Sequence, residues 1–144
     1  TMTSPRTAQP TDPVTRIMTT SVATIDAGAS WAQALAELVG NQIGAVVLID
    51  DNERIGLVSE RDLIYALAQG EVDLQTRQVE EIATFDLIWA PADTSIAQAG
   101  SMMVDAEIRH LPVGDGHDVL GMISARDVLE VLVAAQRASL AGAR

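Results

Sequence analysis

Two short segments of the chain carry the same polar residues in the same order. Residues 56–62 read Gly-Leu-Val-Ser-Glu-Arg-Asp, and residues 121–127 read Gly-Met-Ile-Ser-Ala-Arg-Asp. A carboxylate can accept charge-assisted hydrogen bonds from both hydroxyls of a ribose. A serine just before a helix lies beside free backbone N–H groups that favour phosphate, and arginine adds a planar fork for phosphate oxygens. The candidate ligand-binding residues of these segments are Ser59, Arg61, Asp62, Ser124, Arg126 and Asp127.

The same pattern also has a purely structural interpretation. Ser-x-x-Asp is a common N-terminal helix cap, in which the acidic residue is stabilised by the helix dipole. The glycine that opens each segment can simply mark a close approach of another piece of backbone. Because a cap can also contact a ligand, both interpretations stay open at this point.

Both segments belong to a repeat that covers most of the chain. Residues 14–69 align with residues 79–134 without a gap, at a displacement of 65 positions. A repeat of this kind is examined first, because it determines how the fold is interpreted. Each copy predicts the order β-α-β-β-α, and one copy cannot cover both faces of its small sheet. We therefore expect an α/β fold, of the α+β type, in which two repeats pack together.

The predicted elements follow from capping signals and apolar patterns. A capping box at 30–33, and another at 95–98, each begins a helix with an apolar stripe. Continuous apolar runs predict buried strands, and amphipathic helices follow the Ser-x-x-Asp segments. We expect strands at 21–25, 45–49, 54–58, 110–113 and 119–123, and helices at 30–40, 59–69, 95–105 and 124–136. The remaining divisions are a flexible leader at 1–13, repeat 1 at 14–69, a linker at 70–78, repeat 2 at 79–136 and a C-terminal tail at 137–144.

Composition excludes several classes of function. A net charge of −11 opposes binding to nucleic acid and to anionic membranes. The chain has no cysteine, and all of its basic residues are arginines, so nucleophile-and-base pairs have few candidates. The Gly-Asp-Gly-His segment at 114–117 is typical of a turn and not of a metal site. We expect a cytoplasmic protein that is not an enzyme and has no resident cofactor.

The order of elements and the duplicated Gly-apolar-apolar-Ser-x-Arg-Asp segment resemble the cystathionine-β-synthase (CBS) domain. The strand at 108–113, Ile-Arg-His-Leu-Pro-Val, resembles the middle strand of that family, and the turn at 17–19 fits as well. The resemblance covers residues 14 to about 134. It implies a stand-alone pair of CBS repeats with pseudo-two-fold symmetry and two clefts between the repeats.

The resemblance also implies a ligand and its contacts. Such pairs bind adenine nucleotides or adenosyl compounds and regulate a partner protein, here unknown. The aspartate of Ser-x-x-Asp contacts the ribose, while groups at the start of the middle strand contact the adenine. The first strand contributes from about Met18 to Ala23, and from 83 to Ile88. The residues implied around the adenine are Ile43, Gly44, Ala45, Ile108, Arg109 and His110.

The two repeats differ at the start of the middle strand. Arg109 and His110 stand where the first repeat has Gly44 and Ala45, so only the second repeat offers a cation there. We therefore expect a phosphate-bearing ligand to make more contact with the second repeat, although Arg109 can equally form a surface salt bridge. Apolar helix positions such as Leu67, and others in the last helix, predict a homodimer. The alternative function is a ligand-free structural or dimerisation module.

Overall fold

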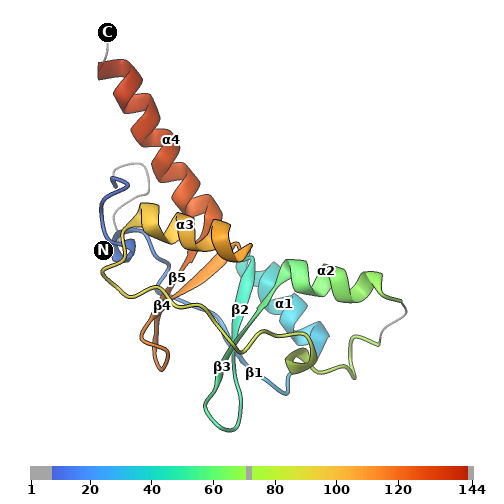
Figure 1. Ribbon diagram of the computed structural model, residues 1–144. Helices are drawn as coiled ribbons and strands as arrows, with labels where there is room; N and C mark the ends of the chain where they lie inside the picture. The colour runs from blue at the N-terminus through green and yellow to red at the C-terminus, as the bar shows by residue number, and fades with distance from the viewer. Residues whose placement is uncertain (1–7, 71–72, 143–144) are drawn as a thin grey trace. The chain divides into compact units, whose positions relative to one another are not determined.

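The computed structural model describes residues 8–70 and 73–142, and its helices and strands follow the predicted order, except that the first strand of the second repeat is not formed (Figure 1). The first repeat contains η1 (Val14–Arg16), β1 (Thr24–Asp26), α1 (Trp31–Asn41), β2 (Ala45–Ile49), β3 (Ile55–Ser59) and α2 (Glu60–Ala68). The second contains η2 (Val79–Glu81), α3 (Ile96–Ala106), β4 (His110–Gly114), β5 (Val119–Ser124) and α4 (Ala125–Gly142). This mixture of helices and small sheets confirms the predicted α+β fold class.

The compact units of the structure do not coincide with the sequence repeats. Residues 22–87 form one unit, here called the contiguous unit. Residues up to 21 and those from 88 onward form the other, here called the discontinuous unit. The opening segment of each repeat therefore packs with the body of the other repeat.

A buried valine anchors each of these opening segments, here called the exchanged segments. The Val14 N–H donates to the carbonyl of Thr94 at 2.8 Å, and the Val79 N–H donates to the carbonyl of Ala29 at the same distance. Both valines are fully buried in the core of the unit that receives them. Burying such a side chain contributes about 1.5–3 kcal/mol. Each unit is therefore completed by a segment that lies outside its own repeat.

The contiguous unit is built on a three-stranded sheet in the order β1-β2-β3. β1 pairs with β2 in parallel, and β2 pairs with β3 in antiparallel. The apolar run of β2 is buried from Ala45 to Leu48, as a strand covered on both faces requires. Trp31 of α1 and Leu63 of α2 complete the core. Thr84 of the exchanged segment pairs with Leu57 on β3.

The discontinuous unit has only two strands, β4 and β5, where the repeat predicts three. The expected first strand is reduced to a single bridge between Ala90 and Val113. In the contiguous unit, the Val47 N–H donates to the carbonyl of Ala23 at 3.0 Å. The equivalent of Val47 is Pro112, which has no N–H to donate. One proline therefore removes the hydrogen bond that would extend this strand.

The predicted capping boxes at the starts of α1 and α3 are confirmed. The Ser30 Oγ accepts from the Gln33 N–H at 3.2 Å, and the Ser95 Oγ accepts from the Gln98 N–H at 3.1 Å. α1 ends at Asn41, one residue beyond the predicted bound of 40. Gln42 forms the left-handed cap with a φ of 52°.

The leader is packed where the structure describes it. Ala8 is buried in the core of the discontinuous unit, and the carbonyl of Pro10 accepts from the Ala97 N–H at 3.0 Å. Residues 8–13 are therefore packed, which differs from the predicted flexible leader at 1–13. Residues 1–7 lie outside the described residues. The tail differs as well, since α4 continues to Gly142 through an alanine-rich sequence that favours helix.

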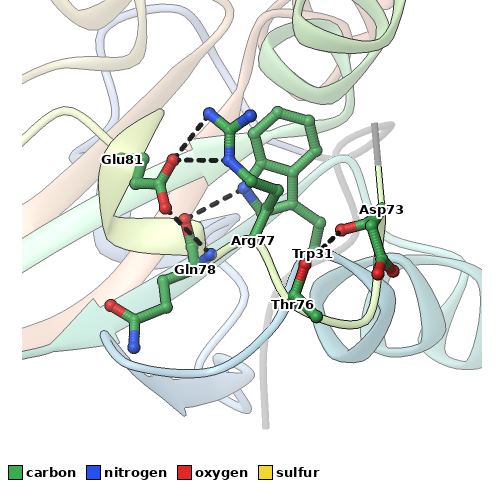
Figure 2. Close-up of polar contacts among 6 residues, drawn as sticks. All are labelled: Trp31, Asp73, Thr76, Arg77, Gln78 and Glu81. Atoms are coloured by element: carbon green, nitrogen blue, oxygen red, sulfur yellow. Dashed lines mark hydrogen bonds and ion pairs between the residues drawn. The ribbon is translucent and has the colours of Figure 1, made fainter. Parts of the chain in front are cut away.

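The linker is held against the first turn of α1 (Figure 2). The Trp31 Nε1–H donates to the carbonyl of Gln78 at 2.9 Å, and the Arg77 guanidinium lies 5.1 Å from the centroid of the indole ring. Arg77 also pairs with Glu81 at 2.7 Å. The hydrogen bond from Arg77 and that from the Gln78 N–H lower the pKa of Glu81. Residues 71–72 of the linker lie outside the described residues.

Candidate functional site

The Ser-x-x-Asp segment of the contiguous unit joins β3 to α2. The Ser59 Oγ accepts from the Asp62 N–H at 3.1 Å, and the Asp62 Oδ2 accepts from the Ser59 N–H at 2.8 Å. Each residue satisfies a backbone donor of the other, which is the geometry of a capping box. The structural interpretation of this segment as a cap is therefore confirmed.

The discontinuous unit repeats this geometry where β5 meets α4. The Ser124 Oγ accepts from the Asp127 N–H at 3.1 Å, and the Asp127 Oδ2 accepts from the Ser124 N–H at 3.0 Å. Both serines and both aspartates are partly exposed. Within the part of the chain that the structure describes, the second carboxylate oxygen of Asp62 and that of Asp127 accept no hydrogen bond. Both caps therefore keep an acceptor that a ligand hydroxyl can reach.

The structure brings the start of the middle strand beside each cap. In the contiguous unit, Ala45 pairs with Ser59, and the carbonyl of Gly44 accepts from the Glu60 N–H at 2.9 Å. Ile43 packs partly against the core behind them. Five of the predicted residues thus gather with Arg61 at this strand–helix junction: Ile43, Gly44, Ala45, Ser59 and Asp62.

The same junction in the discontinuous unit carries different side chains. His110 pairs with Ser124, and the carbonyl of Arg109 accepts from the Ala125 N–H at 2.8 Å. Ile108 packs partly against the core, as its counterpart does in the other unit. The predicted residues at this junction are Ile108, Arg109, His110, Ser124, Arg126 and Asp127.

The predicted residues of the first strands are divided by the exchange of segments. Met18 lies in the discontinuous unit, where it is buried beside β5 and its neighbour Thr19 pairs with Met122. Ala23 lies in the contiguous unit, next to β2. Ile88 lies in the discontinuous unit and is exposed. Met18 therefore groups with the Ser124 junction, although in sequence it belongs to the repeat that contains Ser59.

The two strand glycines mark close approaches. A β-carbon at Gly56 would lie 2.7 Å from the Phe85 ring, and one at Gly121 would lie 2.6 Å from the Met18 sulfur. Phe85 also stacks on Arg54, whose guanidinium is 4.5 Å from the ring centroid. Phe85 lies in the segment 83–88 that the sequence analysis placed at the first strand, but its contact with Gly56 was not predicted.

The arginines near the junctions differ in what they contact. Arg61 lies 5.3 Å from the Tyr65 ring centroid, and Arg126 pairs with Glu130 at 3.5 Å, so each contacts the next turn of its own helix. Arg109 is exposed and makes no ion pair or side-chain hydrogen bond among the residues that the structure describes. Arg109 is therefore an uncompensated cation beside Ser124 in an acidic chain.

Two features of the β4–β5 hairpin have structural roles. Trp89 packs against Gly114 in the β4–β5 hairpin, where a β-carbon on the glycine would lie 3.0 Å from the indole. Hydrogen bonds from the His117 and Asp118 N–H groups lower the pKa of Asp115, as a tight turn requires. The described residues contain no group of three or more acidic or histidine side chains placed to hold a metal ion. No helix among them is long and apolar enough to cross a membrane.

Comparisons with known proteins agree with this geometry. The sequence model of the CBS domain matches residues 4–69 and 79–134. An uncharacterised 17.7 kDa protein of Acidianus ambivalens is 30% identical over 122 residues, which are 83% of this chain and 73% of that protein. A CBS-domain protein of Agrobacterium tumefaciens has a structure with a TM-score of 0.72 at 27% identity, covering 78% of this chain and 84% of that one. The CBS domain pair of protein MJ0100, solved with 5′-methylthioadenosine and S-adenosyl-L-methionine, has a TM-score of 0.77 at 23% identity and covers 88% and 99% of the two chains.

Proposed function

The chain belongs to the CBS domain family as a tandem pair, and we propose that it is a regulatory module that binds an adenosine-containing ligand. The ligand class comprises AMP, ADP, ATP and compounds like S-adenosylmethionine. Binding would shift the populations of two packing states, and this shift would be transmitted to a partner protein. We propose no catalysed reaction and no resident cofactor.

One observation carries this proposal: both units hold a partly exposed Ser–Asp pair beside the start of the middle strand. In each pair the cap uses one carboxylate oxygen, and the second oxygen accepts no hydrogen bond within the described part of the chain. A hydrogen bond from a ribose hydroxyl to this carboxylate oxygen is charge-assisted and contributes about 1.5–3 kcal/mol to binding. We propose that groups at the start of the middle strand contact the base.

We further propose that the junction of the discontinuous unit makes the larger share of contacts with a phosphorylated ligand. Arg109 supplies a cation there. Gly44 and Ala45 supply no charge at the other junction. In a chain with a net charge of −11, a local cation is needed to offset the unfavourable field around a phosphate.

Self-association is part of the proposal. Leu67 on α2 and Leu132 and Val133 on α4 are exposed, and the apolar exposure recurs at equivalent positions of the two repeats. Aliphatic side chains clustered on a helix face favour contact with another protein surface. We propose a homodimer, and light scattering that gives a single 15.2 kDa chain at micromolar concentration would contradict it.

A thermal-shift screen tests the ligand. The compounds are AMP, ADP, ATP, S-adenosylmethionine, NADH and cyclic dinucleotides, each added to the whole protein. A ligand at about 100 times its dissociation constant stabilises the folded state by about 2.7 kcal/mol, which raises the melting temperature by several degrees. No shift with any compound would favour the rival function, a ligand-free structural or dimerisation module whose Ser–Asp pairs are caps alone.

A further inference from the structure

Helix α4 has two faces with different surroundings. Val128 and Val131 are buried and pack into the core of the discontinuous unit. The opposite face carries Leu129, which is 58% exposed, and Leu140, which is 59% exposed. In Figure 1 the C-terminal half of α4 extends beyond α3, and every residue from 136 to 142 is exposed. This half of the helix has no counterpart in α2, which ends at the residue equivalent to Val133.

The exposed face has the spacing of a helix–helix seam. Leu129, Val133, Gln136 and Leu140 follow one another at intervals of four, three and four residues. Apolar residues at alternating intervals of three and four form the contact line of paired helices, and a single polar residue on that line specifies register. A helical segment of fewer than about 12 residues is marginal in water unless it packs against something. The seam therefore fits a helix that is covered by a partner.

We infer that this α4 seam is the contact surface of the proposed homodimer, and that it pairs in antiparallel with the same seam of a second copy of this chain. If the two helices cross antiparallel on a two-fold axis that passes between Ala134 and Ala135, Leu129 of each copy lies opposite Leu140 of the other copy. The seam is therefore self-complementary, as the interface of a two-fold symmetric dimer must be. The inference rests on the proposed self-association and specifies where it occurs.

Charge also favours a second copy in this orientation. α4 carries two arginines, one aspartate and one glutamate, so its net charge is zero in a chain of −11. Two copies can therefore approach along α4 without the repulsion that acts elsewhere. Glu130 and Arg137 lie seven residues apart on the same flank of the seam. An antiparallel axis brings this flank of one helix against the same flank of the other, so that Glu130 lies within reach of the other copy's Arg137.

Cysteine cross-linking tests the orientation, because the chain has no cysteine of its own. Chains with Leu129→Cys and chains with Leu140→Cys, tagged to differ in size, are mixed and oxidised. We expect a mixed disulfide and little disulfide in either variant alone, since the bond requires β-carbons about 3.5–4.5 Å apart. Leu120→Cys, at an exposed leucine of β5, is the control for random collision. Disulfides within each variant alone would overturn the antiparallel orientation.

A matched pair of charge substitutions tests the surface itself. Leu140→Glu adds a charge on the seam, and Ala138→Glu adds the same charge on the opposite, exposed side of the same helix turn. Neither residue is in the core, so both variants should remain folded. Sedimentation velocity should show at least a ten-fold weaker dimer for Leu140→Glu and an unchanged dimer for Ala138→Glu. If the unaltered protein is a monomer, the homodimer itself fails; if it is a dimer that Leu140→Glu leaves intact, only the seam is wrong.

Discussion

Replacing the two equivalent aspartates separates capping from ligand binding. Asp62→Ala and Asp127→Ala each remove a carboxylate that accepts one serine N–H, at 2.8 Å and 3.0 Å respectively. Because the two caps share one geometry, the loss of stability should be nearly equal. Losing an acidic residue from the first turn of a helix costs about 0.3–1 kcal/mol, which corresponds to a fall of up to a few degrees in melting temperature for a chain of this size.

Ligand affinity should not fall equally. If the discontinuous unit dominates binding, Asp127→Ala should weaken a phosphorylated adenosine ligand by about 10- to 150-fold, the equivalent of a charge-assisted hydrogen bond of 1.5–3 kcal/mol. Asp62→Ala should leave most of the affinity. Arg109→Ala should also remove most of the binding without changing either cap, because the Arg109 side chain makes no ion pair within the described residues.

Calorimetric titration of the three variants with the ligand found in the screen gives these affinities. A thermal melt of each variant without ligand is the control, since Arg109→Ala also removes part of a packing stem. The reasoning is refuted if Asp62→Ala is the more damaging substitution, or if Arg109→Ala has no effect. A larger loss of stability in one aspartate variant than in the other would show that the caps are not equivalent.

Three further predictions concern the fold. Gly56→Ala should lower the free energy of unfolding by about 1–3 kcal/mol, because its β-carbon would lie 2.7 Å from the Phe85 ring. Adding Phe85→Leu should recover part of the lost stability in urea melts. A Gly56→Ala variant as stable as the parent would contradict the close contact. Hydrogen bonds from Arg77 and Gln78 lower the pKa of Glu81. The folding stability that they contribute is therefore present above the ordinary glutamate pKa, and it is lost as the pH falls through the lowered pKa of Glu81. Arg77→Gln should therefore lose less stability than the parent between about pH 5 and pH 3, and equal losses would refute this role. Pro112→Val introduces an amide at 112 that should be protected from hydrogen exchange by pairing with the residue 88 carbonyl, whereas exchange at 112 as fast as in an unfolded chain would show that the missing donor does not limit the strand.

The elements that the sequence predicted well are set by local chemistry. The capping boxes at Ser30 and Ser95 depend on a side chain and a backbone N–H three residues apart, so the sequence contains all of the information. β2 was predicted at its observed bounds, because a continuous apolar run between a helix cap and a turn has few alternatives. The family resemblance implied which residues meet at each strand–helix junction.

What the sequence could not predict depends on contacts between distant residues. Val14 and Val79 open the repeats in sequence, yet each is buried in the unit formed by the other repeat. Nothing local distinguishes this exchange from packing within one repeat, because the two repeats are alike. The sequence therefore did not indicate that Met18 lies beside β5 or that Phe85 lies against Gly56.

The central claim is that the Ser–Asp junctions bind an adenosine-containing ligand. Amide chemical-shift mapping by nuclear magnetic resonance tests this claim most directly, with the unaltered protein titrated with ATP and, separately, with S-adenosylmethionine. We predict that at least one compound shifts the amides of residues 108–110 and 124–127 in a saturable manner, and shifts those of 59–62 less. Saturable shifts confined to residues remote from both junctions, or no shifts with either compound, would contradict the claim.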